Sequence, residues 1–160
     1  MLFTRPTLSY EDWIAVSKGA NHVEFDWIGI DNQAQFGIFS SIGMGYIPRK
    51  VFNSYKSYIG LNNFLYDHGK SPTAEIISKE SGSKDFWMEW VLKGLFAYDY
   101  YDVHRKEKFD RYDLIAIPGL PLLVKAVPEL SAFDEVIPKF NLAFSTDILF
   151  KQLVETECDS

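Results

Sequence analysis

The most constraining feature of this sequence is a change in hydrophobic period near residue 22. Over residues 22–31 apolar and polar side chains alternate, which is the period of a half-buried strand. The turn-prone run Asp31-Asn32-Gln33 then separates this segment from a second apolar run at 36–39. Two such runs with a short polar connection predict an antiparallel hairpin. The residues on the apolar side of the first run are Val23, Phe25 and Trp27.

Other segments have helical spacing. Ser9 and Asp12 have the spacing of a capping box, which predicts a helix over 10–17. Pro48 suits a first helical position, and the amphipathic pattern after it predicts a helix as far as Gly60. We expect Gly60 to break or kink this helix and a further turn or two to follow over 61–68. Residues 84–93 are apolar almost all round, which indicates a mostly buried helix. Shorter helices are expected over 71–79 and after a cap at Ser145.

Further strands are predicted at 95–101 and 112–117, with an edge strand at 139–144. Strands grouped in hairpins, with helices grouped between them, indicate an α+β fold. We therefore expect a mostly antiparallel sheet built from hairpins, with helices packed on one face. The 160 residues form one predicted globular domain, 1–160, because a chain of this length buries roughly two-thirds of its unfolded surface.

Charge and composition limit the partners. The chain has 16 Lys and Arg against 22 Asp and Glu, a formal net charge of −6. Such a field disfavours nucleic-acid binding and attracts a basic protein. No apolar run reaches the roughly 18 to 20 residues of a membrane span, and no basic stretch leads into an apolar run at the N-terminus. With Cys158 as its single cysteine, the chain is expected to be cytoplasmic.

The sequence contains no recognisable catalytic set. Its three histidines have no zinc-ligand spacing, it has no Gly-x-Ser-x-Gly elbow, and Cys158 lies in a polar tail. Gly43 and Gly45 lie between a strand and a helix, as in phosphate-binding loops, but the Walker lysine and the third dinucleotide glycine are missing. Tight-turn geometry explains both glycines better. We expect neither a metal nor a cofactor, and a binding protein is favoured over an enzyme.

Two groups of residues are candidates for binding. Arg49 and Lys50 place cations in a first helical turn, which opposes the helix dipole and suggests a nearby anion that the preceding loop amides could also face. The second group would share one face if the strand at 95–101 continued beyond Asp99, and it could line a pocket or an interface. Its members are Tyr98, Tyr100, Asp102 and His104. Core packing of these aromatic side chains is the competing interpretation.

Four short motifs resemble a group of uncharacterised single-domain bacterial proteins. They are Trp27-Ile28-Gly29-Ile30-Asp31, Gly37-Ile38-Phe39, Gly43-Met44-Gly45-Tyr46-Ile47-Pro48 and Gly94-Leu95-Phe96-Ala97-Tyr98-Asp99. Small acidic α+β proteins of this group are often suspected to be immunity proteins, which neutralise a toxin by binding it. The resemblance rests on turn glycines and strand aromatics, so it assigns no functional residue.

The leading hypothesis is a non-catalytic protein-binding domain, of the immunity type in its most specific form, with an acidic and aromatic surface. The alternative is a small-molecule-binding domain or an unrecognised enzyme with a pocket near the loop Ser40–Pro48. A structural homodimer is a third alternative, which would require an exposed apolar patch that matches itself about a two-fold axis.

Overall fold

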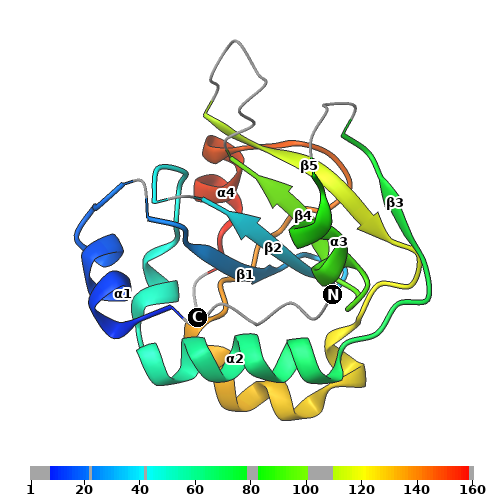
Figure 1. Cartoon of the computed structure of the whole chain (residues 1–160), viewed down its shortest axis with the longest axis horizontal. Coiled ribbons are helices and arrows are strands. Elements are labelled where there is room, and N and C mark those ends of the chain that lie inside the picture. Colours follow the sequence, from blue (N-terminus) through cyan, green and yellow to red (C-terminus); the bar gives the residue numbers. More distant parts are fainter. Residues whose placement is uncertain (1–7, 22, 42, 79–82, 101–109, 159–160) are drawn as a thin grey trace.

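Six strands form one curled, mixed sheet (Figure 1). The structure is a computed structural model that describes residues 8–21, 23–41, 43–78, 83–100 and 110–158. The strand order is β1-β2-β4-β5-β3, and β6 pairs with β5 outside this path. Among the strand pairs of the described residues, β2–β4 is parallel and the other four are antiparallel, so the predicted α+β class with a mostly antiparallel sheet is confirmed. The strands are β1 (Asp26–Ile30), β2 (Phe36–Ser40), β3 (Ala74–Ile76), β4 (Phe96–Asp99), β5 (Arg111–Pro118) and β6 (Ile148–Leu149).

Helical segments precede, separate and follow these strands. The α-helices are α1 (Tyr10–Ser17), α2 (Tyr55–His68), α3 (Asp85–Val91) and α4 (Phe150–Thr156), and the 3₁₀ segments are η1 (Arg49–Phe52), η2 (Val124–Ala126) and η3 (Pro128–Val136). The predicted cap of α1 is confirmed, because the backbone N–H of Asp12 donates to Ser9 Oγ at 3.1 Å. Within the described residues, no helix combines the length and the apolar character that crossing a membrane requires.

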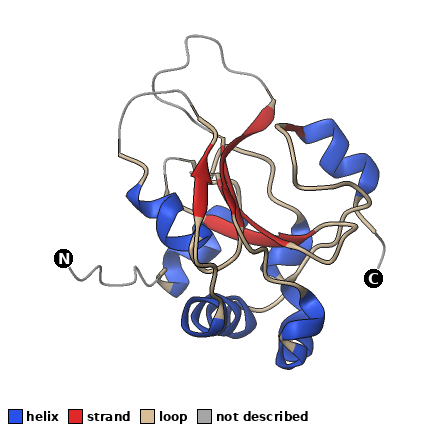
Figure 2. Cartoon of the chain, turned by 90° about the vertical axis from the view of Figure 1, so that its right-hand side faces the viewer, coloured by secondary structure: helices blue, strands red, loops and turns tan. Residues whose placement is uncertain are grey.

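The sheet is buried on both faces, and Figure 2 shows helices on either side of it. Alternation along each central strand sends consecutive residues to opposite faces. Trp27, Phe39 and Tyr98 belong to one buried cluster, to which α4 contributes Leu153. The opposite cluster takes residues from α2, α3 and η3. Its central members are Ile28, Ile38, Leu61, Trp90, Ala97 and Leu130.

Stacked aromatic rings tie three strands together. The strand register places Trp27 beside Phe39 and Phe39 beside Tyr98. The ring centroids are 4.1 Å and 4.8 Å apart in these two pairs, with interplanar angles of 8° and 7°. Tyr112 of β5 meets the Phe39 ring edge-on at 5.1 Å. The ring ladder, as we name Trp27, Phe39, Tyr98 and Tyr112, therefore spans four adjacent strands.

The hydroxyl group of Tyr112 satisfies two buried polar groups. It accepts a hydrogen bond from the Trp27 indole N–H at 3.1 Å and donates one to the Tyr46 carbonyl at 2.7 Å. Trp27 and Tyr112 are both fully buried. Without this hydroxyl, the indole N–H would lie in the core without a partner.

Four of the sequence-based expectations about local structure were wrong. The strand predicted at 22–31 is shorter, and β1 is buried on both faces from Trp27 onward. Gly60 does not break a helix: Ser54 caps α2 through the Ser57 N–H, and α2 continues past Gly60. A Cβ atom at Gly60 would lie 2.6 Å from the Phe133 ring, so this glycine allows η3 to approach closely.

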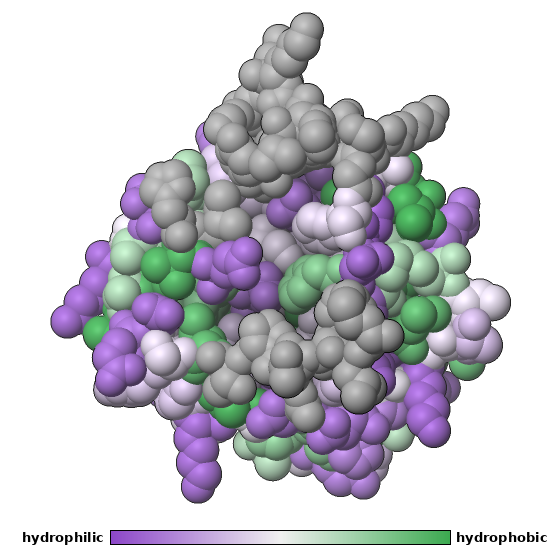
Figure 3. Space-filling model, in the orientation of Figure 1, coloured by the Kyte–Doolittle hydropathy of each residue, from purple (hydrophilic) through white to green (hydrophobic). Residues whose placement is uncertain are grey.

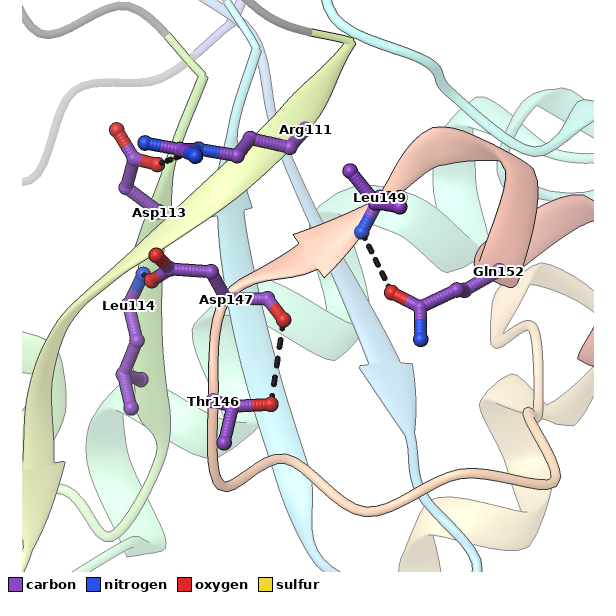
Figure 4. A network of polar contacts seen from close by, with 7 residues as sticks. All are labelled: Arg111, Asp113, Leu114, Thr146, Asp147, Leu149 and Gln152. Carbon is purple, nitrogen blue, oxygen red and sulfur yellow. Dashed lines mark hydrogen bonds and ion pairs between the residues drawn. The ribbon is translucent and has the colours of Figure 1, made fainter.

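Pairing with β5 explains the other two local differences. The segment predicted as a helix over 71–79 contains β3, which pairs antiparallel with β5 at the sheet edge. Ser145 caps no helix, because 148–149 pair with β5 before α4 begins. Asp147 supports this pairing by accepting a 2.8 Å hydrogen bond from the Leu114 N–H (Figure 4). At the start of α4, the Gln152 side chain accepts from the Leu149 N–H at 2.8 Å.

We predict that Tyr112→Phe lowers the free energy of unfolding by about 1–3 kcal/mol, because a buried indole N–H and a carbonyl lose their partner. Urea denaturation checks this. Tyr10→Phe is the matched control, since Tyr10 is 53% exposed, and it should change stability by less than about 0.5 kcal/mol. Equal stability of the two variants would contradict the assigned role of the hydroxyl.

Candidate functional site

Arg49 and Lys50 lie in η1, after Pro48. The Arg49 guanidinium donates to the Ser17 carbonyl at 2.9 Å, and its Cζ lies 5.6 Å from the centre of the Phe52 ring. The cation that seemed to oppose a helix dipole thus interacts with the C-terminal end of α1, where carbonyl groups attract positive charge. Arg49 has an internal partner, and Lys50 is half-buried beside it.

The loop before η1 uses its amides internally. The N–H groups of Met44 and Gly45 donate to the Ser41 carbonyl at 2.9 Å and 3.0 Å, and the Gly43 N–H donates to Ser41 Oγ at 3.2 Å. Gly43 has a φ of +72°, and a Cβ there would lie 2.5 Å from the Ala20 carbonyl oxygen. Tight-turn geometry therefore accounts for Gly43, and these amides are not directed at an external anion.

Tyr98 and Tyr100 are interior residues. Tyr98 has no exposed surface, and its hydroxyl donates to the Thr146 carbonyl at 2.9 Å. Burial raises the pKa of Tyr98 far above its usual range, with further increases from the charges of Asp147 and Asp31. Tyr100 packs its ring against Phe150 at 5.4 Å. We therefore assign both tyrosines to the core, and the two remaining members of that group, Asp102 and His104, lie outside the described residues.

The structure brings together acidic and aromatic residues that the sequence did not group. They line a cavity of about 300 Å³, which we name the acidic pocket. Residues from α1, α2, α3 and the start of β1 surround it, and the described lining includes no Lys or Arg. Its acidic members are Asp12, Glu24, Asp26 and Glu89, and its aromatic members are Tyr58, Tyr66, Phe86 and Trp90.

Asp26 is the electrostatic centre of the acidic pocket. Burial raises the pKa of its carboxyl group from 3.8 to about 7, and the charge of Glu24 adds to this increase. The Ser40 hydroxyl, on the strand paired with β1, opposes it. A pKa near 7 means that the groups around Asp26 stabilise its ionised form too little to offset burial. A cation entering the pocket would stabilise the carboxylate over the protonated acid.

Two tyrosines fix the walls of the acidic pocket. The Tyr58 hydroxyl donates to the backbone carbonyl of Asp26 at 2.5 Å, and the Tyr66 hydroxyl donates to the Glu89 carboxylate. Burial, followed by the charge of Asp26, raises the pKa of Tyr58 well above its usual value. The Tyr58 hydroxyl therefore remains a protonated donor, and the two hydrogen bonds hold β1 and α3 against α2.

The described residues contain no group of three or more His, Cys, Asp or Glu side chains arranged to hold a metal ion. The carboxylates, amides and rings of the acidic pocket suit a guanidinium or ammonium group, which can form charge-assisted hydrogen bonds and contact ring faces.

No protein-family model, curated protein or solved structure matches this chain.

We predict that the free energy of unfolding falls between pH 4 and pH 7 in the parent, and that Asp26→Asn makes this fall smaller. In the parent, Asp26 holds its proton up to about pH 7 when folded and releases it near 3.8 when unfolded. The folded state therefore binds more protons in this interval, so the parent's free energy of unfolding receives a contribution that falls as pH rises. Asn has no such contribution, and above pH 7 the variant should be the more stable protein.

Urea midpoints measured from pH 4 to pH 8 check this prediction. Glu129→Gln removes an exposed carboxylate outside the acidic pocket and should follow the parent at every pH. If the Asp26→Asn profile also followed the parent, the assigned burial of the Asp26 charge would be wrong.

Proposed function

We propose that this chain is a non-catalytic protein-binding domain that presents the acidic pocket to a basic side chain of its partner. The observation that carries the proposal is the composition of this pocket, where four carboxylates and four aromatic rings meet without a Lys or Arg in the described lining. The charge of Glu24 raises the pKa of Asp26, and a guanidinium or ammonium group in the pocket relieves this repulsion.

The charge of the whole chain supports the same kind of partner. A net charge of −6 steers basic proteins toward the surface and raises their association rate. Within the pocket, aromatic walls exclude water from the contact and strengthen it. Arg is the side chain best suited to this environment, because its planar fork pairs with carboxylates and stacks on rings.

In the most specific form of the proposal, the partner is a toxin and this chain is its immunity protein. Small acidic domains suit this role because a domain that binds tightly to a basic surface of a toxin blocks that surface. A small-molecule-binding domain or enzyme with a pocket near Ser40–Pro48 has less support. Neither the acidic pocket nor the second cavity described below is lined by residues of that loop, and its amides at 43–45 are bonded internally.

The test is capture of partners from lysate of the native host by three tagged proteins: parent, Glu24→Lys and Glu129→Lys. Both variants reverse one exposed carboxylate, but only Glu24 lines the acidic pocket. The parent and Glu129→Lys should retain one stoichiometric basic protein, whose affinity falls with salt. Glu24→Lys should bind it at least about tenfold more weakly, a loss of about 1.4 kcal/mol. Equal retention by both variants would contradict a partner contact at the pocket.

Growth measurements test the immunity form. Expression of the captured partner alone should arrest growth, and co-expression of the parent chain or Glu129→Lys should restore it. Glu24→Lys should restore growth poorly. A captured partner that is harmless when expressed alone would refute the immunity form while leaving the protein-binding proposal standing.

A further inference from the structure

A second cavity, of about 560 Å³, is lined by the end of β1, the β1–β2 turn and residues between 124 and 141, with Cys158. We name it the η3 pocket, because η3 forms one wall. The end of β1 and its turn form a second wall, and residues 137–141 with Cys158 form a third. Its volume lies within the range of roughly 300–1,000 Å³ that is typical of small-molecule sites.

The inner surface of the η3 pocket is apolar and belongs to the protein core. Val127, Leu130, Ile137 and Phe140 line it and are each at most 7% exposed. Because these side chains are packed in the two core clusters on their other sides, the wall cannot easily collapse into the space. A concave apolar surface of this size releases water when an apolar molecule covers it.

Hydrogen bonds fix the position of the walls. The Ile30 N–H donates to the Pro138 carbonyl at 3.0 Å, and the Phe140 N–H donates to the Ile30 carbonyl at 2.9 Å. The buried Asp31 carboxylate accepts four hydrogen bonds, each 2.9 Å long, two of them from Gln35. The other two come from the N–H groups of Gln33 and Phe144. Two walls of the η3 pocket, the end of β1 with its turn and the segment after η3, are therefore joined by hydrogen bonds within the chain.

The rim of the η3 pocket is polar, and the Asp31 carboxylate that also lines the pocket is satisfied by its four hydrogen bonds within the chain. Asp134 and Lys139 neutralise each other in an ion pair of 3.0 Å. Three exposed polar residues, Asn32, Ser131 and Asn141, also line the pocket, and within the described chain their side chains make no hydrogen bond. These groups can donate to and accept from a ligand, whereas a charged ligand would have to break the ion pair.

We propose that the η3 pocket binds an uncharged, largely apolar small molecule whose hydrogen-bonding end faces Asn32, Ser131 and Asn141. A single apolar side chain of a partner protein would leave much of the 560 Å³ wet, so a separate molecule fits this space better. The site is independent of the acidic pocket, and no residue lines both cavities.

The neutral fluorophore N-phenyl-1-naphthylamine tests the proposal. Its emission rises when it enters an apolar site, and we expect saturable binding at one site per chain. Ser131→Trp places a bulky ring at the exposed rim and should weaken binding at least tenfold. Ala132→Trp is the matched control, because Ala132 is exposed on the same segment but does not line the pocket, and it should bind like the parent.

Cys158 gives an independent report of where the probe binds. It is the single cysteine of the chain, is exposed and lines the η3 pocket. Bound fluorophore should slow its alkylation by iodoacetamide at least severalfold in the parent and in Ala132→Trp. Absence of saturable binding, equal affinity of the two Trp variants, or unchanged alkylation would each overturn the proposal.

Two further comparisons complete the test. The anionic probe 1-anilinonaphthalene-8-sulfonate should bind at least tenfold more weakly than the neutral one, and equal affinity would overturn the preference for an uncharged ligand. Glu24→Lys should bind the neutral probe like the parent. A loss of probe binding in Glu24→Lys would contradict the independence of the two sites, whatever the outcome of the partner experiment.

Discussion

The rest of the structure depends on the ring ladder that crosses β1, β2, β4 and β5. Parallel stacking of Trp27, Phe39 and Tyr98 requires their strands to hold one register, since a slip of one residue would send each ring to the opposite face. The Tyr112 hydroxyl adds a directional requirement by joining the Trp27 indole to the Tyr46 carbonyl. Hydrophobic burial alone would not select this register, whereas ring geometry and one shared hydroxyl do.

The sequence predicted those parts of the fold that local patterns determine. Alternation revealed the β1–β2 hairpin, and the Ser9–Asp12 spacing revealed the start of α1. The sequence did not predict local structure where contacts with residues distant along the chain determine it. Gly60 continues a helix because Phe133 packs against it, and residues 74–76 form a strand because β5 offers an edge. Such contacts have no signal in the neighbouring sequence.

The same distinction applies to the candidate sites. Glu24 and Asp26 were visible only as polar residues of the alternating run at 22–31, and Glu89 only as one of the few polar residues of the helix predicted at 84–93. Their meeting in one cavity depends on how α2 and α3 pack beside β1, so the acidic pocket could not be predicted. Conversely, Tyr98 and Tyr100 were attractive as chemical groups, but the sheet that their own strand builds encloses them. Whether a side chain lines a cavity or is buried in the core, more than its residue type, distinguishes the acidic pocket residues from Tyr98 and Tyr100.

The parallel pairing of β2 with β4 also has a consequence for the order of folding. The β1–β2 hairpin closes a short turn, so Trp27 and Phe39 can stack within the microseconds that hairpins require. Pairing of β2 with β4 must instead close a loop that contains residues 41–95, with α2, β3 and α3 inside it. Non-local pairing is slow. We therefore infer that the β1–β2 hairpin, with Trp27 stacked on Phe39, forms first, and that the later stacking of Tyr98 on Phe39 is the rate-limiting step in forming the native sheet.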